Sequence, residues 1–124
     1  MQKVNLLEKF GQFAERWSPK IVGELNGQQV KLVKVAGEFL WHHHDEEDEL
    51  FLVVHGILHM DYRDSEGDEH RVNLGEGEFL IVPRGVEHRP SADDEAHVLL
   101  FEPASTLNTG NVQSERTVRE PERL

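Results

Sequence analysis

Short β-rich runs separated by turn signals dominate the chain between residues 21 and 101. Branched and aromatic residues suit the pleated surface of a strand, while glycine, asparagine and proline interrupt it. The clearest turn is Asn26-Gly27, because a two-residue hairpin turn needs positive φ at both positions. The runs that we expect to be strands cover residues 21–25, 28–35, 50–54, 57–62, 71–74, 79–82 and 97–101. The pattern amounts to about eight short strands and predicts an all-β sandwich or small barrel.

The two ends of the chain depart from this pattern. Apolar residues between positions 4 and 14 have a mixed spacing that predicts a short helical or irregular segment, ended by Ser18-Pro19. After Pro103 the chain turns polar, and residues 104–124 are expected to form a C-terminal arm that packs on its own barrel or on a neighbour, or to be a flexible tail. No repeat or linker divides the chain, so we expect one domain over residues 1–124, with its barrel core at about 20–103.

Charge and composition exclude several classes of protein. The formal net charge is −11, whereas a protein that follows phosphates needs a basic face, so neither nucleic acid nor an anionic membrane is an expected partner. No apolar stretch approaches the roughly 20 residues that cross a bilayer, and the N-terminus lacks an apolar signal core, so we expect a cytoplasmic protein. The absence of cysteine excludes disulfides, thiolate metal sites and thiol nucleophiles.

Three adjacent histidines, His42 to His44, are the most conspicuous candidates for chemistry. Imidazole is the commonest protein metal ligand, and a carboxylate such as Glu49 joins it when the metal is a harder divalent ion. In an extended segment His42 and His44 point to one face, because side chains alternate along a strand, and His43 points away. A solvated acidic loop is the alternative for this stretch, and it is the preferred interpretation of residues 45–48.

Two spaced motifs give these residues a context. The first motif holds Gly37, His42, His44, Glu49 and Gly56, and the second holds Gly77, Pro83, Gly85 and His88. With these motifs the chain resembles the cupin superfamily, specifically its small single-domain members. Two positions depart from the family pattern: one residue is missing between Gly37 and the first histidine, and Ala92 replaces a final asparagine. The motifs span nearly half of the chain and are specific for a fold and a metal site, but not for a reaction.

The resemblance implies a jelly-roll barrel, also called a double-stranded β-helix, with one bound metal ion. His42, His44, Glu49 and His88 would be the ligands of a divalent transition metal, and the choice among iron, manganese, nickel and zinc stays open. Four ligands leave about two open positions on an octahedral ion, and three neutral imidazoles with one carboxylate leave roughly one positive charge. Such a centre favours a small oxygenated substrate that is anionic or enolate-like. The family also leads us to expect a homodimer.

The preferred function is therefore a metal-dependent enzyme that acts on a hydroxy, keto or carboxylate metabolite. The reaction would use Lewis-acid or O₂ chemistry, as in a dioxygenase, an isomerase or a lyase. Glu49 is a candidate proton acceptor, and His97 is a candidate proton donor if the run from His97 to Phe101 turns it inward; a core or surface histidine is the alternative. A non-catalytic module that binds a small molecule or a metal is the second hypothesis.

Overall fold

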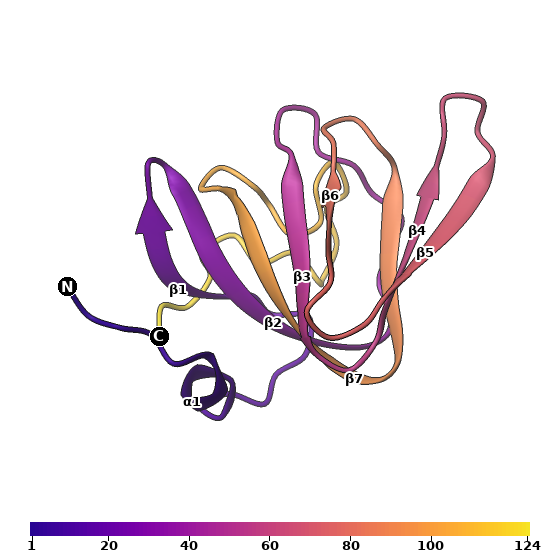
Figure 1. Ribbon diagram of the computed structural model, residues 1–124. Coiled ribbons are helices and arrows are strands. Elements are labelled where there is room, and N and C mark those ends of the chain that lie inside the picture. Colours follow the sequence, from indigo (N-terminus) through magenta and orange to yellow (C-terminus); the bar gives the residue numbers. More distant parts are fainter.

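The computed structural model describes all residues from 1 to 124 and consists of antiparallel strands with one short helix (Figure 1). The elements are α1 (Leu6–Phe10), β1 (Lys20–Leu25), β2 (Gln28–Glu38), β3 (Glu49–His55), β4 (Leu58–Arg63), β5 (Glu69–Leu74), β6 (Phe79–Val82) and β7 (His88–Pro103). The all-β prediction and the short N-terminal helical segment are confirmed. Asn26 and Gly27 have φ values of 50° and 77°, as the predicted hairpin turn requires.

The last strand differs most from its prediction. The sequence predicts a strand over residues 97–101, whereas β7 runs for 16 residues from His88 to Pro103. Its first part, residues 88–91, pairs with β4, and its second part pairs with β2 on one side and β3 on the other. The acidic run 93–95 and Pro90 break the alternation of apolar residues, so the two parts do not look like one strand in the sequence.

This long strand joins the two sides of the molecule. The strand order is β1-β2-β7-β3-β6, and β4 pairs with both β5 and β7. In Figure 1, β7 passes from beside β4 to beside β2 and β3, so one strand closes both sides of the fold around a common interior. The arrangement is the jelly roll that the resemblance implies.

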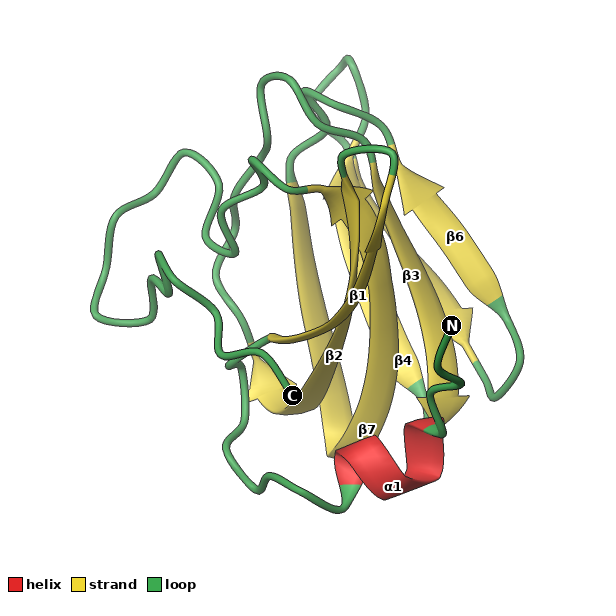
Figure 2. Ribbon diagram, turned by 90° about the vertical axis from the view of Figure 1, so that its left-hand side faces the viewer, coloured by secondary structure: helices red, strands yellow, loops and turns green.

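The interior follows from the two-residue period of the strands. Alternate residues of β2, β3 and β7 point into a single apolar cluster, which includes Val35, Phe51, Val53, Val98 and Leu100. The other face of β2 carries Leu32, on which Phe10 and Phe13 from the N-terminal segment pack. Figure 2 shows α1 at one end of the strands, away from most of the loops.

The C-terminal arm packs on its own barrel. Ala104 N donates to Gly27 O at 3.0 Å, and Asn111 N donates to His43 O at the same distance. At the chain end, residues 122–124 exchange hydrogen bonds with the backbone of Ile21 in β1. The arm is expected to pack on its own barrel, to pack on a neighbour or to be flexible, and the structure shows it packed on its own barrel.

Two further expectations concern membrane-spanning segments and a homodimer. No helix is long and apolar enough to cross a membrane. Phe79 and Ile81 alternate on β6 and are 59% and 55% exposed, which leaves an apolar strip on an edge strand. The homodimer stays a prediction.

The glycine after β3 offers a test of how tightly the sheet is packed. Gly56 has φ of 86°, and a Cβ there would lie 3.2 Å from both Cα and Cβ of Ala96. Gly77 has a similar φ of 81° with nothing within 4 Å of a Cβ. We expect Gly77→Ala to lower the free energy of unfolding by about 1 kcal/mol through backbone strain, and Gly56→Ala by a further 1–3 kcal/mol, roughly, through crowding.

Urea denaturation of both variants measures this difference. Equal free energies of unfolding for Gly56→Ala and Gly77→Ala would contradict the close approach of β7 to Gly56.

Candidate metal centre

His42 and His88 face each other across an isolated antiparallel bridge. His42 N donates to His88 O at 3.1 Å, and His88 N donates to His42 O at 2.9 Å. Residues that are paired in this way carry their side chains on the same side, and the two ring centroids lie 4.3 Å apart. The backbone of the two motifs thus brings two imidazoles together.

His44 completes a group of three imidazoles. It points to the same side as His42, with ring centroids 5.2 Å apart, and its carbonyl oxygen accepts a hydrogen bond of 2.7 Å from Gly85 N. One ring nitrogen from each of His42, His44 and His88 lies within 4.8 Å of the other two, and all three residues are buried. A group of this size can hold a single metal ion.

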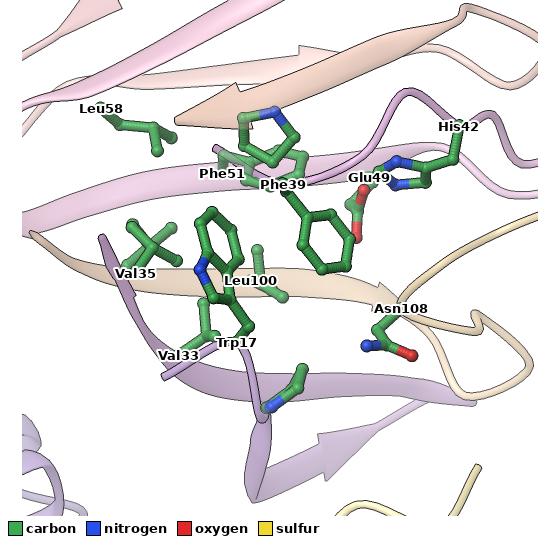
Figure 3. A pocket seen from close by; sticks show the side chains of 13 residues that line it. Trp17, Val33, Val35, Phe39, His42, Glu49, Phe51, Leu58, Leu100 and Asn108 are labelled. Atoms are coloured by element: carbon green, nitrogen blue, oxygen red, sulfur yellow. The ribbon is translucent and has the colours of Figure 1, made fainter. Parts of the chain in front are cut away.

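Glu49 adds a carboxylate to this group. It is the first residue of β3, is 4% exposed, and places Oε1 3.3 Å from His44 Nε2 and 3.6 Å from His88 Nε2. Figure 3 shows this carboxylate beside the ring of His42. The structure therefore brings together all four residues that the sequence nominates as ligands.

Hydrogen bonds to the backbone orient two of the rings. His42 Nδ1 lies 2.9 Å from Leu40 O, and His88 Nδ1 lies 2.9 Å from Val86 O. A carbonyl oxygen only accepts, so each Nδ1 carries a proton, and in the neutral ring the lone pair is then on Nε2. Metal-binding histidines use the same arrangement, in which the far nitrogen donates and fixes the ring.

Three inward-facing atoms of this group have no hydrogen-bond partner in the protein. His44 Nε2, His88 Nε2 and Glu49 Oε1 are buried and make no hydrogen bond. Burying a polar atom without a partner costs about 1–3 kcal/mol, so three in one place call for an explanation. Imidazole nitrogen and carboxylate oxygen are the donors that bind divalent transition metals, and the residues present therefore fit such an ion.

The electrostatics favour the forms that bind metal. Burial, with a smaller contribution from His88, lowers the pKa of His42 from 6.5 to about 3, so this ring is neutral at physiological pH. Burial alone would raise the pKa of Glu49, but contacts with His44 and His88 outweigh it and hold that pKa below its usual value. A metal ion binds imidazole in its neutral form and a carboxyl group in its ionised form.

A small apolar cavity adjoins His42 and Glu49 (Figure 3). Its lining is mostly apolar, and Trp17, Phe39, Val33, Val35, Phe51, Leu58, Val98 and Leu100 contribute to it. Trp17 stacks on Phe39 with centroids 4.8 Å apart, and Asn108 of the C-terminal arm adds an amide. The sequence did not nominate Trp17 or Asn108, because both lie outside the two motifs and reach the cavity only through the fold.

A buried pair of ionisable residues lies near Glu49. Glu102 of β7 is 2% exposed, and its Oε1 is 3.8 Å from the ammonium group of Lys31 in β2. Burial, together with the negative charge of Glu49, raises the pKa of Glu102 well above its usual value. Nothing in the residue pattern indicates this pair, since a lysine and a glutamate in strands normally face solvent.

His97 lies away from the centre, which corrects the suggestion that it faces the interior. Its neighbours Ala96 and Val98 are fully buried in the interior, so the alternation of β7 turns His97 to the outer face. There it stacks on Phe10 at 4.7 Å, and its Nε2 lies 3.0 Å from Glu95 Oε1. His97 is therefore a packed histidine on the outer face, as the alternative interpretation of the sequence has it.

The low pKa of His42 predicts how stability depends on pH in metal-free protein. The unfolded chain takes up a proton at His42 near its ordinary pKa of 6.5, while the folded chain does not until about 3. The unfolded state therefore binds more protons in this window, and the free energy of unfolding falls as pH drops from 6.5 to 4.5. The contribution of His42 is up to about 1.4 kcal/mol per pH unit.

Urea unfolding with a chelator present, at several pH values, measures this slope, and His42→Gln should lack that contribution. The raised pKa of Glu102 contributes an opposite slope in both proteins, so the comparison isolates His42. Identical slopes would mean that His42 is not held neutral.

Comparison with known proteins places the chain in a family. The model of the cupin domain family matches residues 29–102. The uncharacterized protein YdbB of Bacillus subtilis is 35% identical over 85 residues, which cover 68% of this chain and 72% of that protein. The crystal structure of a cupin-2 domain containing protein from Shewanella frigidimarina is 42% identical, with a TM-score of 0.75, and the match covers 81% of this chain and 93% of that chain.

Two dioxygenases are also similar to this chain. Acireductone dioxygenase from Yarrowia lipolytica is 29% identical over 98 residues, which cover 79% of this chain but 57% of that enzyme. Hydroquinone 1,2-dioxygenase from Sphingomonas sp. TTNP3, solved in complex with 4-nitrophenol, shares the fold at 20% identity, with a TM-score of 0.74 over 84% of this chain and 33% of that chain. The family model covers more than half of the chain, and the protein therefore belongs to the cupin family.

Proposed function

We propose that this cupin is a mononuclear metal-dependent dioxygenase that acts on a small hydroxylated or keto substrate. The observation that carries the proposal is the buried group of three imidazoles and one carboxylate with unpartnered atoms, of which His42 and Glu49 also line an apolar cavity. The names of the similar dioxygenases support the class of reaction. They do not extend to the substrate, because this chain spans little more than half of the Yarrowia enzyme.

The ligands in this proposal are His42, His44, Glu49 and His88, and the ion is a divalent transition metal. Iron, manganese, nickel and zinc all accept imidazole and carboxylate, so the donor set does not choose among them. When bound, such an ion polarises the oxygen atoms of a substrate and, if it is redox-active, supports chemistry with O₂.

The other residues of the cavity would bind the substrate and exclude water. Trp17, Phe39 and Phe51 form an apolar wall beside the ligands, which suits a flat molecule and lowers the local dielectric. The cavity volume is about 40 Å³, far below the 300–1,000 Å³, roughly, of drug-sized sites, so a small substrate fits best. Glu49 is a candidate acceptor for a hydroxyl proton of the substrate.

A non-catalytic binding module is the second candidate function. Apart from the proposed ligands His42 and Glu49, none of the residues that line the cavity has an ionisable side chain, so no independent general acid or base is present. A module that only binds a metal or a small molecule needs no such group. The two functions differ in turnover, which the second experiment below measures.

The ligand assignment predicts the metal content of variants. We expect about one first-row metal ion per chain in protein purified without a metal-affinity tag, measured by elemental analysis. His88→Ala should lower this content more than about tenfold, because it removes a buried ligand. His43→Ala is the matched control, since His43 lies between two ligands but contacts Asp45 instead, at 3.0 Å. Unchanged metal in His88→Ala, or equal losses in both variants, would contradict the assignment.

The dioxygenase assignment predicts oxygen uptake. We expect the iron-loaded protein to consume O₂ with at least one of hydroquinone, catechol or a small keto acid, and His88→Ala to reduce kcat/KM about 100-fold. An oxygen electrode, with free iron as the blank, makes the measurement. Turnover without oxygen would point to an isomerase or a lyase. Saturable binding without turnover would support the binding module.

A further inference from the structure

The segment that carries His42 and His44 is held on two edges. In an extended segment the backbone N–H and C=O groups of successive residues point to opposite sides. The backbone of His42 faces His88, with which it exchanges two hydrogen bonds. The backbone of His43 faces the other way, toward the C-terminal arm. A strand would normally pair with this second edge, and none of the seven strands does.

Asn111 takes the place of that missing strand. His43 N donates to Asn111 Oδ1 at 2.8 Å, and Asn111 N donates to His43 O at 3.0 Å. One residue of the arm therefore satisfies both backbone groups of the residue between the two ligands. The pairing resembles the reciprocal pair of an antiparallel bridge, with a side-chain oxygen in place of one carbonyl.

Gly110 lets the arm come this close. A Cβ at Gly110 would overlap the carbonyl oxygen of His43 and lie 3.1 Å from Cδ2 of His42. The φ of 55° at this residue is a further reason for glycine. The arm thus touches the ring of one ligand and the backbone of the next residue.

The arm is itself fixed, so it is able to hold another segment. Asn108 Oδ1 accepts from Val118 N at 2.8 Å, and its Nδ2 donates to Arg116 O at 2.9 Å. The hydroxyl groups of Thr109 and Thr117 are 2.7 Å apart, and Thr109 is fully buried. Arg116 also donates to Glu38 O at 3.0 Å. Internal hydrogen bonds thus hold the loop between residues 106 and 118, which is attached to the histidine segment at His43 and to the end of β2 at Glu38.

We infer that Asn111 is a positioning residue for the metal centre, holding the His43 backbone so that His42 and His44 keep the orientation in which both bind the ion. This inference rests on the proposed ligand set and adds to it a residue far from either motif. Groups that orient metal ligands typically change metal affinity by about 10–100-fold when they are removed. The effect passes through the backbone, so it does not need Asn111 to touch the metal or the substrate.

The test uses the full chain loaded with Co²⁺, whose visible absorption reports ligand geometry. Asn111→Ala should increase the rate of Co²⁺ release to a chelator by about tenfold or more and shift the absorption bands. Asn111→Asp keeps the acceptor oxygen and should restore the wild-type rate and spectrum. Gln113→Ala and Gln113→Glu, at an exposed position of the same arm, control for truncation and for added charge.

Further variants keep the result interpretable. Asn111→Leu, which has the same number of side-chain heavy atoms but lacks the acceptor, replaces Asn111→Ala if thermal unfolding shows that the latter does not fold without metal. Gly110→Ala should release Co²⁺ faster still, because its Cβ displaces the arm. Wild-type release and spectra in Asn111→Ala or Asn111→Leu, while His88→Ala loses the ion, would overturn the positioning role alone. A wild-type chain that binds no stoichiometric Co²⁺ would overturn the ligand set itself, and this inference with it.

Discussion

The backbone pair between His42 and His88 is the contact on which the centre depends. Two hydrogen bonds join two motifs that are far apart in the chain, and they place both rings on one side of the bridge. His88 is also the first residue of β7, the strand that pairs with β2, β3 and β4. The position of one ligand is therefore fixed by the same register that builds the core, and Glu49, at the start of β3, is placed by the neighbouring register.

The interior shows a compromise between stability and chemistry. Val53 and Val98 lie in a tightly packed apolar cluster, while Glu49 and Glu102 carry carboxyl groups into the same interior. Each polar group without a partner costs free energy, and burial raises the pKa of Glu102, which favours the neutral form of that carboxyl group. A chain selected for stability alone would fill these positions with apolar side chains. Buried carboxyl groups beside unpartnered imidazoles are typical of a functional site, where stability is given up for chemistry.

The sequence predicts what depends on local spacing and misses what depends on register. His42 and His44 are nominated by their two-residue spacing and His88 by its proline–glycine turn, and the structure brings all three together. The outward orientation of His97 is not readable in this way. Both faces of this run carry apolar residues, with Val98 and Leu100 on one face and Leu99 on the other, so alternation alone does not say which face turns inward. Trp17 and Asn108 belong to no motif and reach the cavity only through long-range packing.

A metal site built on a histidine pair with one residue between them carries a structural requirement of its own. The two ligands face the metal, so the backbone of the intervening residue necessarily points to the edge that the ligand strand does not share with its partner. If that edge meets only water, the segment is free to twist, and any twist turns the two rings in different directions. Here the edge is covered by a loop whose sequence has no motif, through the two hydrogen bonds between His43 and Asn111. The geometry of the site is then decided partly by residues that carry none of its chemistry, which explains why motif spacing alone identifies the ligands but not how firmly they are held.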